Sequence, residues 1–291
     1  MPAPHSLEAS YFVYDVFTKT RFGGNQLAVF PDASGLPEDR LQAIAREFNF
    51  SEVTFCYPPA DPAHTARVRI FTPTSEVPFA GHPTIGTAVA LADLGQGPEM
   101  VLELGVGPIP CVVGPEGASF TTGVPLQILS QPPVDLVAEA LGLPVSALQT
   151  ATHSPVMASL GLSFVFAELT DRAALSAANP QIDAMRRGAM AYPSGQGAGL
   201  DFAIFAYVRK GEQVEARMFA PLDNVPEDPA TGSASATLGA YLAGLPGGPE
   251  RLAITQGVDM GRPSQIAVST GPKGVTVAGQ AVKVMAGTLY V

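Results

Sequence analysis

Glu52 is the side chain of this sequence best suited to move a proton. It lies at a predicted helix-to-strand junction in the segment Phe50-Ser51-Glu52-Val53-Thr54-Phe55, with apolar residues on both sides. Apolar surroundings raise the pKa of a carboxyl group, and a general acid or base that works near neutral pH needs such a raised pKa. The segment therefore predicts a catalytic carboxyl group. A solvated glutamate at the end of a strand is the alternative that the same segment allows.

His82 is the second candidate, at the start of the helix predicted within Val77–Ala92. A helix start carries unpaired backbone N–H groups and the positive end of the helix dipole, so it is suited to hold an anion. Taken alone, a histidine here is more often a structural residue. Gly81 stands directly before it.

Asp228 and Ser233 flank a similar helix start in the segment Glu227-Asp228-Pro229-Ala230-Thr231-Gly232-Ser233. Taken alone, they indicate only capping and loop chemistry. Together with His82 they could orient a substrate, while the N–H groups after Gly81 and Gly232 hold its carboxylate.

The helix after His82 is apolar on nearly every face, and such a helix is stable only if it is buried. The pattern around it occurs twice: Arg69-x-Phe71-x-Pro73-x-x-x-Val77-Pro78 returns 148 residues later as Arg217-x-Phe219-x-Pro221-x-x-x-Val225-Pro226. One long period indicates a duplicated domain rather than a solenoid. Each half is expected to wrap its strands around one buried helix, with both helix starts at a shared cleft.

The duplication predicts an α+β protein of two pseudo-symmetric lobes. The first lobe is expected at residues 1–125, completed by about 280–291, and the second at 126–279. Glu52 has no clean counterpart in the second half, because adding 148 leads to Leu200, with Asp201 next to it. The cleft would therefore hold one strong acid or base from the first lobe.

Composition limits the function classes. The chain has 291 residues, 46% of them hydrophobic and 14% charged, and its formal net charge is −10, which disfavours nucleic acid and anionic membranes as partners. Cys56 and Cys111 lie in apolar runs and are expected to be buried free thiols. The start shows no leader-like pattern and no run spans a bilayer, so a soluble cytoplasmic protein is expected.

Several common motifs are absent from the sequence: a Walker loop, a G-x-S-x-G elbow, a dinucleotide fingerprint and a zinc-like Cys/His spacing. Gly195-x-Gly197-x-Gly199 and Gly105-x-Gly107 precede no helix and are expected to form turns. We therefore expect neither an organic cofactor nor a metal.

At these residues the chain resembles the PhzF family, the phenazine-biosynthesis isomerase-like proteins with the diaminopimelate epimerase fold. The resemblance covers nearly the whole chain. Its most specific parts are Gly81-His82-Pro83-Thr84 and Asp228-Pro229-Ala230-Thr231-Gly232-Ser233, and it extends through Gln256-Gly257-x-x-Met260-Gly261-Arg262-Pro263-Ser264. One departure is Gln26, where the family usually has proline.

The resemblance implies two lobes, each a strand barrel around a central helix, with the C-terminal segment packed on the first lobe. It also implies a homodimer and cofactor-free proton shuttling. Glu52 matches the family's acid/base, His82 and Asp228 its catalytic polar partners, and the substrate-binding positions fall on Ser51, Gly81, Gly232 and Ser233. Related racemases use two facing thiols, but Cys56 and Cys111 lie away from the helix starts.

The leading hypothesis is an isomerase that moves a proton within a small carboxylate-bearing metabolite. Two alternatives remain open. One is an acyl-transfer enzyme with Ser233, His82 and Asp228 as its triad, which the missing nucleophile elbow disfavours. The other is a catalytically retired scaffold that binds a metabolite or a protein. The sequence does not name the substrate or show a part in phenazine synthesis.

Overall fold

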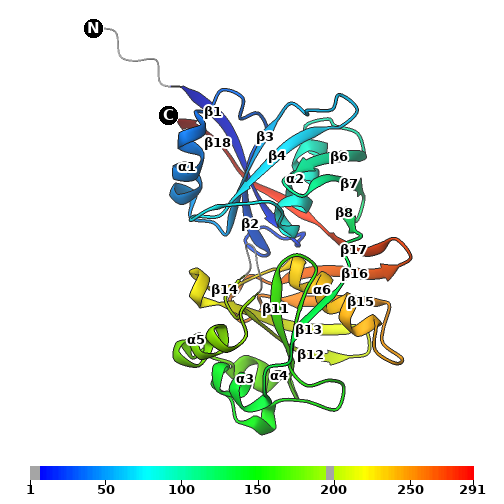
Figure 1. Ribbon diagram of the computed structural model, residues 1–291. Coiled ribbons are helices and arrows are strands. Elements are labelled where there is room, and N and C mark those ends of the chain that lie inside the picture. Colours follow the sequence, from blue (N-terminus) through cyan, green and yellow to red (C-terminus); the bar gives the residue numbers. More distant parts are fainter. Residues whose placement is uncertain (1–6, 195–199) are drawn as a thin grey trace. The chain divides into compact units, whose positions relative to one another are not determined.

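The computed structural model describes residues 7–194 and 200–291. It divides into two units, residues 1–121 with 278–291 and residues 122–277 (Figure 1). The division predicted from the duplication was 1–125 with about 280–291, and 126–279. The predicted turn at Gly195–Gly199 lies outside the described residues.

The first unit is built mainly from antiparallel strand pairs, with β2 and β3 parallel and β4 and β6 parallel. Its strands are β1 (Glu8–Val16), β2 (Asn25–Phe30), β3 (Glu52–Tyr57), β4 (Ala66–Phe71), β5 (Glu76–Val77), β6 (Glu99–Leu104), β7 (Gly107–Gly114), β8 (Gly117–Thr122) and β18 (Ala281–Tyr290). The last of these pairs along the whole of β1, so the predicted return of the C-terminal segment is confirmed.

Helix α2 (Gly81–Asp93) is the centre of the first unit. It contacts β1, β2, β3, β6, β7 and β18, and every residue from Gly81 to Leu91 is buried. The predicted burial of this helix on all sides is therefore confirmed. Helix α1 (Leu41–Phe48), preceded by the 3-10 turn η1 (Glu38–Arg40), packs outside β3 and β4, where Phe30, Phe55 and Phe71 form an apolar layer.

The second unit places α6 (Gly232–Ala243) against β10, β11, β15 and β16. Its strands are β9 (Gln127–Ser130), β10 (Val156–Ser159), β11 (Ser163–Glu168), β12 (Ile204–Lys210), β13 (Gln213–Ala220), β14 (Val225–Asp228), β15 (Arg251–Gln256), β16 (Ser264–Gly271) and β17 (Gly274–Gly279). Shorter elements are α3 (Val134–Ala140), η2 (Val145–Ala147), α4 (Arg172–Ala177), α5 (Ile182–Ala191) and η3 (Pro221–Asp223).

Strand pairing repeats between the units. In the first, β1–β2 is antiparallel, β2–β3 parallel, β3–β4 antiparallel and β4–β6 parallel. In the second, β10–β11, β11–β12, β12–β13 and β13–β15 follow the same series. Both units thus wrap an all-round apolar helix in strands, as predicted.

The register corrects one detail of the repeat. Val77 pairs with Ile70, and Asp228 pairs with Met218, which is the repeat counterpart of Ile70. Asp228-Pro229 therefore stands where the first unit has Val77-Pro78, and the predicted match of Val77 with Val225 is wrong. The extra 3-10 turn η3 lengthens the connection in the second unit and shifts the alignment.

The counterpart of Glu52 also follows from the register. Val53 lies opposite Phe71 and Ile204 lies opposite Phe219, so Ala203 takes the place of Glu52. The sequence offset had pointed to Leu200, which is wrong because the connection between β12 and β13 is shorter than the one between β3 and β4. Either residue is apolar, and the conclusion that the second unit has no counterpart of this acid is unchanged.

The repeated arginines form matching forks. Arg69 donates through Nε and Nη2 to the two carboxylate oxygens of Glu76 at 2.8 and 2.7 Å, and it lies over the ring of Phe71. Arg217 makes the same pair with Glu227 at 2.8 Å for both bonds and lies over Phe219. Bidentate geometry makes such pairs stronger than single contacts. Each fork ties a central strand to the short strand before a helix start.

We expect Arg217→Met to lower the free energy of unfolding by about 3 kcal/mol, because Glu227 would be left with no partner at a largely buried position. The Arg217 side chain is only 11% exposed, and its Nη1 also donates to carbonyl oxygens at the end of α4. Urea unfolding measures the change. The exposed pair Arg187–Glu139 is the control, and Arg187→Met should cost at most about 1 kcal/mol. Equal effects of the two substitutions would contradict the prediction.

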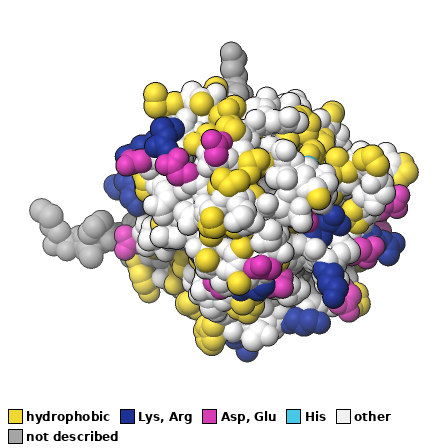
Figure 2. All heavy atoms as spheres, turned by 90° about the horizontal axis from the view of Figure 1, so that it is seen from below, with side chains coloured by type: hydrophobic (Ala, Val, Ile, Leu, Met, Phe, Trp, Pro, Cys, Tyr) yellow, Lys and Arg dark blue, Asp and Glu magenta, His cyan; other side chains and the backbone are white. Residues whose placement is uncertain are grey.

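The surface carries both signs of charge. On the face shown in Figure 2, lysine and arginine side chains lie among aspartate and glutamate in small mixed groups. In the described part of the chain, no helix has both the length and the apolar character needed to cross a membrane.

Candidate functional site

Glu52 occupies the junction that the sequence predicted. Helix α1 ends at Phe48, Asn49 adopts the left-handed conformation at φ 53°, and Glu52 is the first residue of β3. Its side chain is 17% exposed, and its Oε2 is buried without a hydrogen bond to any described residue. Burial raises the pKa of Glu52 to about 7, although a hydrogen bond from Ser51 acts in the opposite direction. The carboxyl group can therefore both accept and donate a proton near neutral pH.

The structure brings His82 to this carboxyl group. His82 is the second residue of α2 and is 4% exposed, and its Nδ1 lies 3.5 Å from Oε2 of Glu52. Ser51 Oγ donates to Oδ1 of Asn25 at 3.0 Å, which joins the start of β2 to the start of β3. Ser51, Glu52, Gly81 and His82 thus form one group within the first unit.

A buried pair of threonines ties the two elements that carry this group. Thr87, in α2, donates through Oγ1 to Oγ1 of Thr54, in β3, at 3.0 Å, and Thr54 donates on to the Ala28 carbonyl oxygen at 3.4 Å. Both threonine side chains are fully buried. Because Thr54 is two residues after Glu52, the two side chains point to the same face of the strand. The tie therefore fixes the helix against the strand next to Glu52.

We expect Thr87→Val to lower the free energy of unfolding by about 1 kcal/mol, since it keeps the shape of the side chain and removes one buried hydrogen bond. Denaturant unfolding measures the difference. Thr87→Ser is the matched control, because it retains the hydroxyl group. A valine variant as stable as the wild type would show that the bond contributes nothing.

The two helix starts are alike in lacking a side-chain cap. The N-cap residues are Ala80 for α2 and Thr231 for α6, and neither caps its helix with a side-chain hydrogen bond. Gly81 and Gly232 are the first helical residues, and both are buried. First-turn N–H groups that no cap satisfies are suited to an anionic group.

Asp228 lies in the second unit with Gly232 and Ser233. It is the last residue of β14 and is 7% exposed, and it accepts a hydrogen bond of 2.5 Å at Oδ2 from the Thr231 hydroxyl. Ser233 is the second residue of α6, at the place that His82 takes in α2, and its side chain is half-buried. The predicted residues thus form one group in each unit.

The sequence did not single out Gln256 as a functional residue. It is the last residue of β15, fully buried, and its side chain bonds both Asp228 and Thr231. Two signals were available: Gln256 begins a segment that the family resemblance covers, and it replaces Leu104 in the echo of Leu104-Gly105 by Gln256-Gly257.

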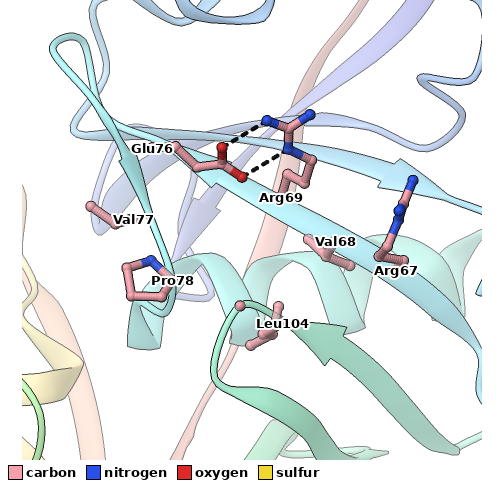
Figure 3. A pocket seen from close by; sticks show the side chains of 8 residues that line it. Arg67, Val68, Arg69, Glu76, Val77, Pro78 and Leu104 are labelled. Carbon is pink, nitrogen blue, oxygen red and sulfur yellow. Dashed lines mark hydrogen bonds and ion pairs between the residues drawn. The ribbon is translucent and has the colours of Figure 1, made fainter. Parts of the chain in front are cut away.

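A surface hollow of about 450 Å³ lies elsewhere in the first unit and contains none of the predicted site residues. Figure 3 shows that Arg69 reaches across it to Glu76, so the charge of Arg69 is already paired. The hollow is lined by Arg67, Val68, Arg69, Glu76, Val77, Pro78, Leu104 and Gly105. We attach no ligand to it.

The two cysteines are buried and free, as predicted, in β3 and β7. Burial raises the pKa of both thiols, Cys56 and Cys111, to about 12, so neither is a thiolate near neutral pH. Neither lies at a helix start, where two-thiol chemistry would need them. Within residues 7–194 and 200–291, no three His, Cys, Asp or Glu side chains are grouped as metal ligands.

Known proteins resemble this chain over nearly its full length. The phenazine biosynthesis-like protein model, PhzC-PhzF, matches residues 14–287. A Mesorhizobium japonicum protein named as an uncharacterized isomerase is 38% identical and covers 97% of this chain and 99% of its own. The trans-2,3-dihydro-3-hydroxyanthranilate isomerase of Pseudomonas aeruginosa is 36% identical over 88% of each chain. The Bacillus anthracis phenazine biosynthesis protein of the PhzF family shares the fold, with a TM-score of 0.85 at 23% identity over 98% of this chain and 100% of that one.

Strands wrapped around a buried helix, in two repeated units, define the epimerase-like α+β fold, and the predicted fold class is confirmed. The chain belongs to the PhzC-PhzF family of phenazine biosynthesis-like proteins. The resemblance stated from the sequence is therefore correct. The predicted enzyme class, an isomerase, is likewise confirmed by the relatives.

Proposed function

We propose that the protein is an isomerase that moves a proton within a small carboxylate-bearing metabolite, with Glu52 as its general acid and base. The observation that carries this proposal is the Glu52 carboxyl group, whose pKa is raised by burial to about 7, with His82 3.5 Å away. A group with this pKa can take a proton and give it back at neutral pH.

The proposed reaction conserves all atoms. Glu52, as a carboxylate, removes a proton from an activated carbon of the substrate, and the electron pair shifts within the substrate. Glu52, now protonated, returns the proton to a different carbon and is ionised again. Burial of the carboxyl group keeps the carried proton from rapid exchange with solvent.

Substrate binding is assigned to the polar groups near each helix start. First-turn N–H groups after Gly81 suit the substrate carboxylate, and they would also stabilise negative charge as it develops. His82 and Ser51 orient the substrate beside Glu52. In the second unit, Asp228 is proposed as a further acid/base group, and Gly232 and Ser233 as substrate-binding residues. We also propose a homodimer.

The substrate class follows from the site and from one relative. Trans-2,3-dihydro-3-hydroxyanthranilate, the compound named for the Pseudomonas aeruginosa relative, is a small carboxylate, so it is the first probe to use. It would meet the need for an anionic group at a helix start.

The experiment follows turnover of this probe in deuterium oxide, by NMR, for the wild-type protein and Glu52→Gln. We expect the wild type to form an isomer and the variant to lose that activity, and the carbon that receives the proton should carry little deuterium, because the carried proton is shielded from solvent. Full activity of Glu52→Gln would overturn the assignment of Glu52. Binding of the probe without turnover by the wild type would favour the retired-scaffold alternative.

A further inference from the structure

Gln256 uses its whole side-chain amide to hold the segment around Asp228. Its Nε2 donates to the Asp228 carbonyl oxygen at 2.7 Å and to Thr231 Oγ1 at 2.9 Å. Its Oε1 accepts from the Thr231 backbone N–H at 3.1 Å. Exchanging the oxygen and nitrogen of the amide would face acceptor with acceptor and donor with donor, so these partners fix its orientation.

These bonds determine where the Thr231 hydroxyl group points. Because Nε2 of Gln256 donates to Oγ1, the hydroxyl proton of Thr231 is free to be given to another acceptor, and it goes to Oδ2 of Asp228 at 2.5 Å. Hydrogen bonds in such a chain polarise and strengthen one another in a buried site. All three residues are at most 7% exposed.

The first unit shows that the fold does not need this network. By the strand register and the helix starts, Val77 takes the place of Asp228, and Ala80 takes that of Thr231. Leu104, the last residue of β6, takes the place of Gln256 at the end of β15. In the first unit, an apolar residue stands at each of these three places. The fold therefore forms without this network, which is present only in the unit that has Asp228.

The turn after Gln256 packs on the same segment in both units. Gly257, at φ 75°, would place a Cβ 2.7 Å from the Pro229 carbonyl oxygen, and Gly105 would place one 2.7 Å from Cα of Pro78. Both units share this close approach, so we assign it to the packing of the fold. The second unit adds Ser264, whose Oγ donates to the Pro229 carbonyl oxygen at 2.7 Å.

We propose that Gln256 is a positioning residue for Asp228, acting through the Thr231 hydroxyl group. Gln256 holds Thr231 so that its hydroxyl proton keeps the Asp228 carboxylate in one orientation toward the substrate. This inference rests on the proposed role of Asp228 in catalysis. It assigns a task to a glutamine that neither the chemistry at Glu52 nor the fold requires.

Charged neighbours of the network are already paired. On β13, Arg217 is bonded to Glu227, the residue before Asp228 on β14, and Asp259 follows in the turn after β15, 3.8 Å from Arg217 and paired with Arg172. The hydroxyl bond from Thr231 is a side-chain contact that orients the Asp228 carboxylate.

The test uses Gln256→Leu, which introduces the residue that the first unit has at this place, and follows turnover of trans-2,3-dihydro-3-hydroxyanthranilate. We expect kcat to fall about 10- to 100-fold, as for a misplaced catalytic group, with KM near the wild-type value. Thr231→Val should have the same effect, and Thr231→Ser, which restores the hydroxyl, should recover kcat. The double variant Gln256→Leu/Thr231→Val should be no worse than either single one, because both remove one network.

Gln265→Leu is the matched control, because Gln265 is an exposed glutamine on β16 whose side chain bonds only Thr255 among the described residues. It should leave kcat unchanged. Wild-type kcat in Gln256→Leu, or a Thr231→Ser variant no better than Thr231→Val, would overturn the proposal.

Amide hydrogen exchange separates this proposal from the proposed function. The Thr231 N–H should be protected in the wild type and should exchange faster in Gln256→Leu, with or without turnover. Unchanged exchange would overturn the role of Gln256 even if Glu52→Gln is inactive. Conversely, full activity of Glu52→Gln with faster exchange in Gln256→Leu would overturn the proton shuttle at Glu52 and leave the contact to Thr231 standing.

Discussion

Glu52→Gln is expected to lower kcat about 10²- to 10⁴-fold, the usual contribution of one general acid/base. The amide keeps the size of the carboxyl group but cannot carry the proton from one carbon to the other. Turnover of trans-2,3-dihydro-3-hydroxyanthranilate at saturating concentration measures the loss. Glu47→Gln, on the exposed side of α1, is the matched control and should be fully active. A Glu52→Gln variant within a few-fold of the wild type would show that another group moves the proton.

The pH dependence of the wild type should report the same carboxyl group. If the ionised form of Glu52 starts the reaction, kcat/KM rises with pH through about 7, where its pKa lies. That rise should be missing from the residual activity of Glu52→Gln. An inflection well below pH 6 in the wild type would contradict a buried base at this position.

The free energy of unfolding of the wild type should fall as pH rises, whereas kcat/KM should rise. The unfolded chain ionises this carboxyl group near 4.5, whereas the folded protein does so near 7, so the folded state binds more protons between these values. The wild type therefore loses stability as pH rises from 4.5 to 7, by up to about 3 kcal/mol at 1.4 kcal/mol per pKa unit. Glu52→Gln lacks this loss and should be the more stable protein above pH 7. If the free energies of unfolding of the two proteins ran parallel across this pH range, burial of the ionised Glu52 would carry no cost.

Phe55→Ala is the second large expected effect, a loss of about 3–5 kcal/mol in the free energy of unfolding. Phe55 is fully buried in β3, stacked on Phe30 with ring centroids 5.0 Å apart and edge-on to Phe71 at 5.5 Å. Removing the ring leaves a cavity under α1 on the strand that carries Glu52. At about 2–4 °C per kcal/mol for units of this size, Tm should fall by about 6–20 °C.

Phe22→Ala is the control for this substitution, because Phe22 is 71% exposed. Its effect should stay within about 0.5 kcal/mol. Thermal unfolding followed by circular dichroism compares the two variants under one set of conditions. Similar Tm values for both would mean that the layer under α1 does not hold the first unit together.

The sequence alone was sufficient for features that depend on local composition and on the duplication. A helix that is apolar on nearly every face can be stable only in a core, so the burial of α2 followed directly. Apolar residues around Glu52 were enough to predict a raised pKa, because desolvation depends on near neighbours.

Only the tertiary structure decided which distant residues meet. Val77 corresponds to Asp228 because the extra turn η3 lengthens the connection in the second unit. Ala203 corresponds to Glu52 because the connection between β12 and β13 is shorter than the one between β3 and β4, and sequence offsets encode neither change. The bond from Gln256 to Asp228 spans 28 residues and joins two strand ends through one buried amide. A glutamine has no local signature for such a role, since its hydrogen-bond partners are chosen by packing; its task became visible only beside the leucine at the same place in the first unit.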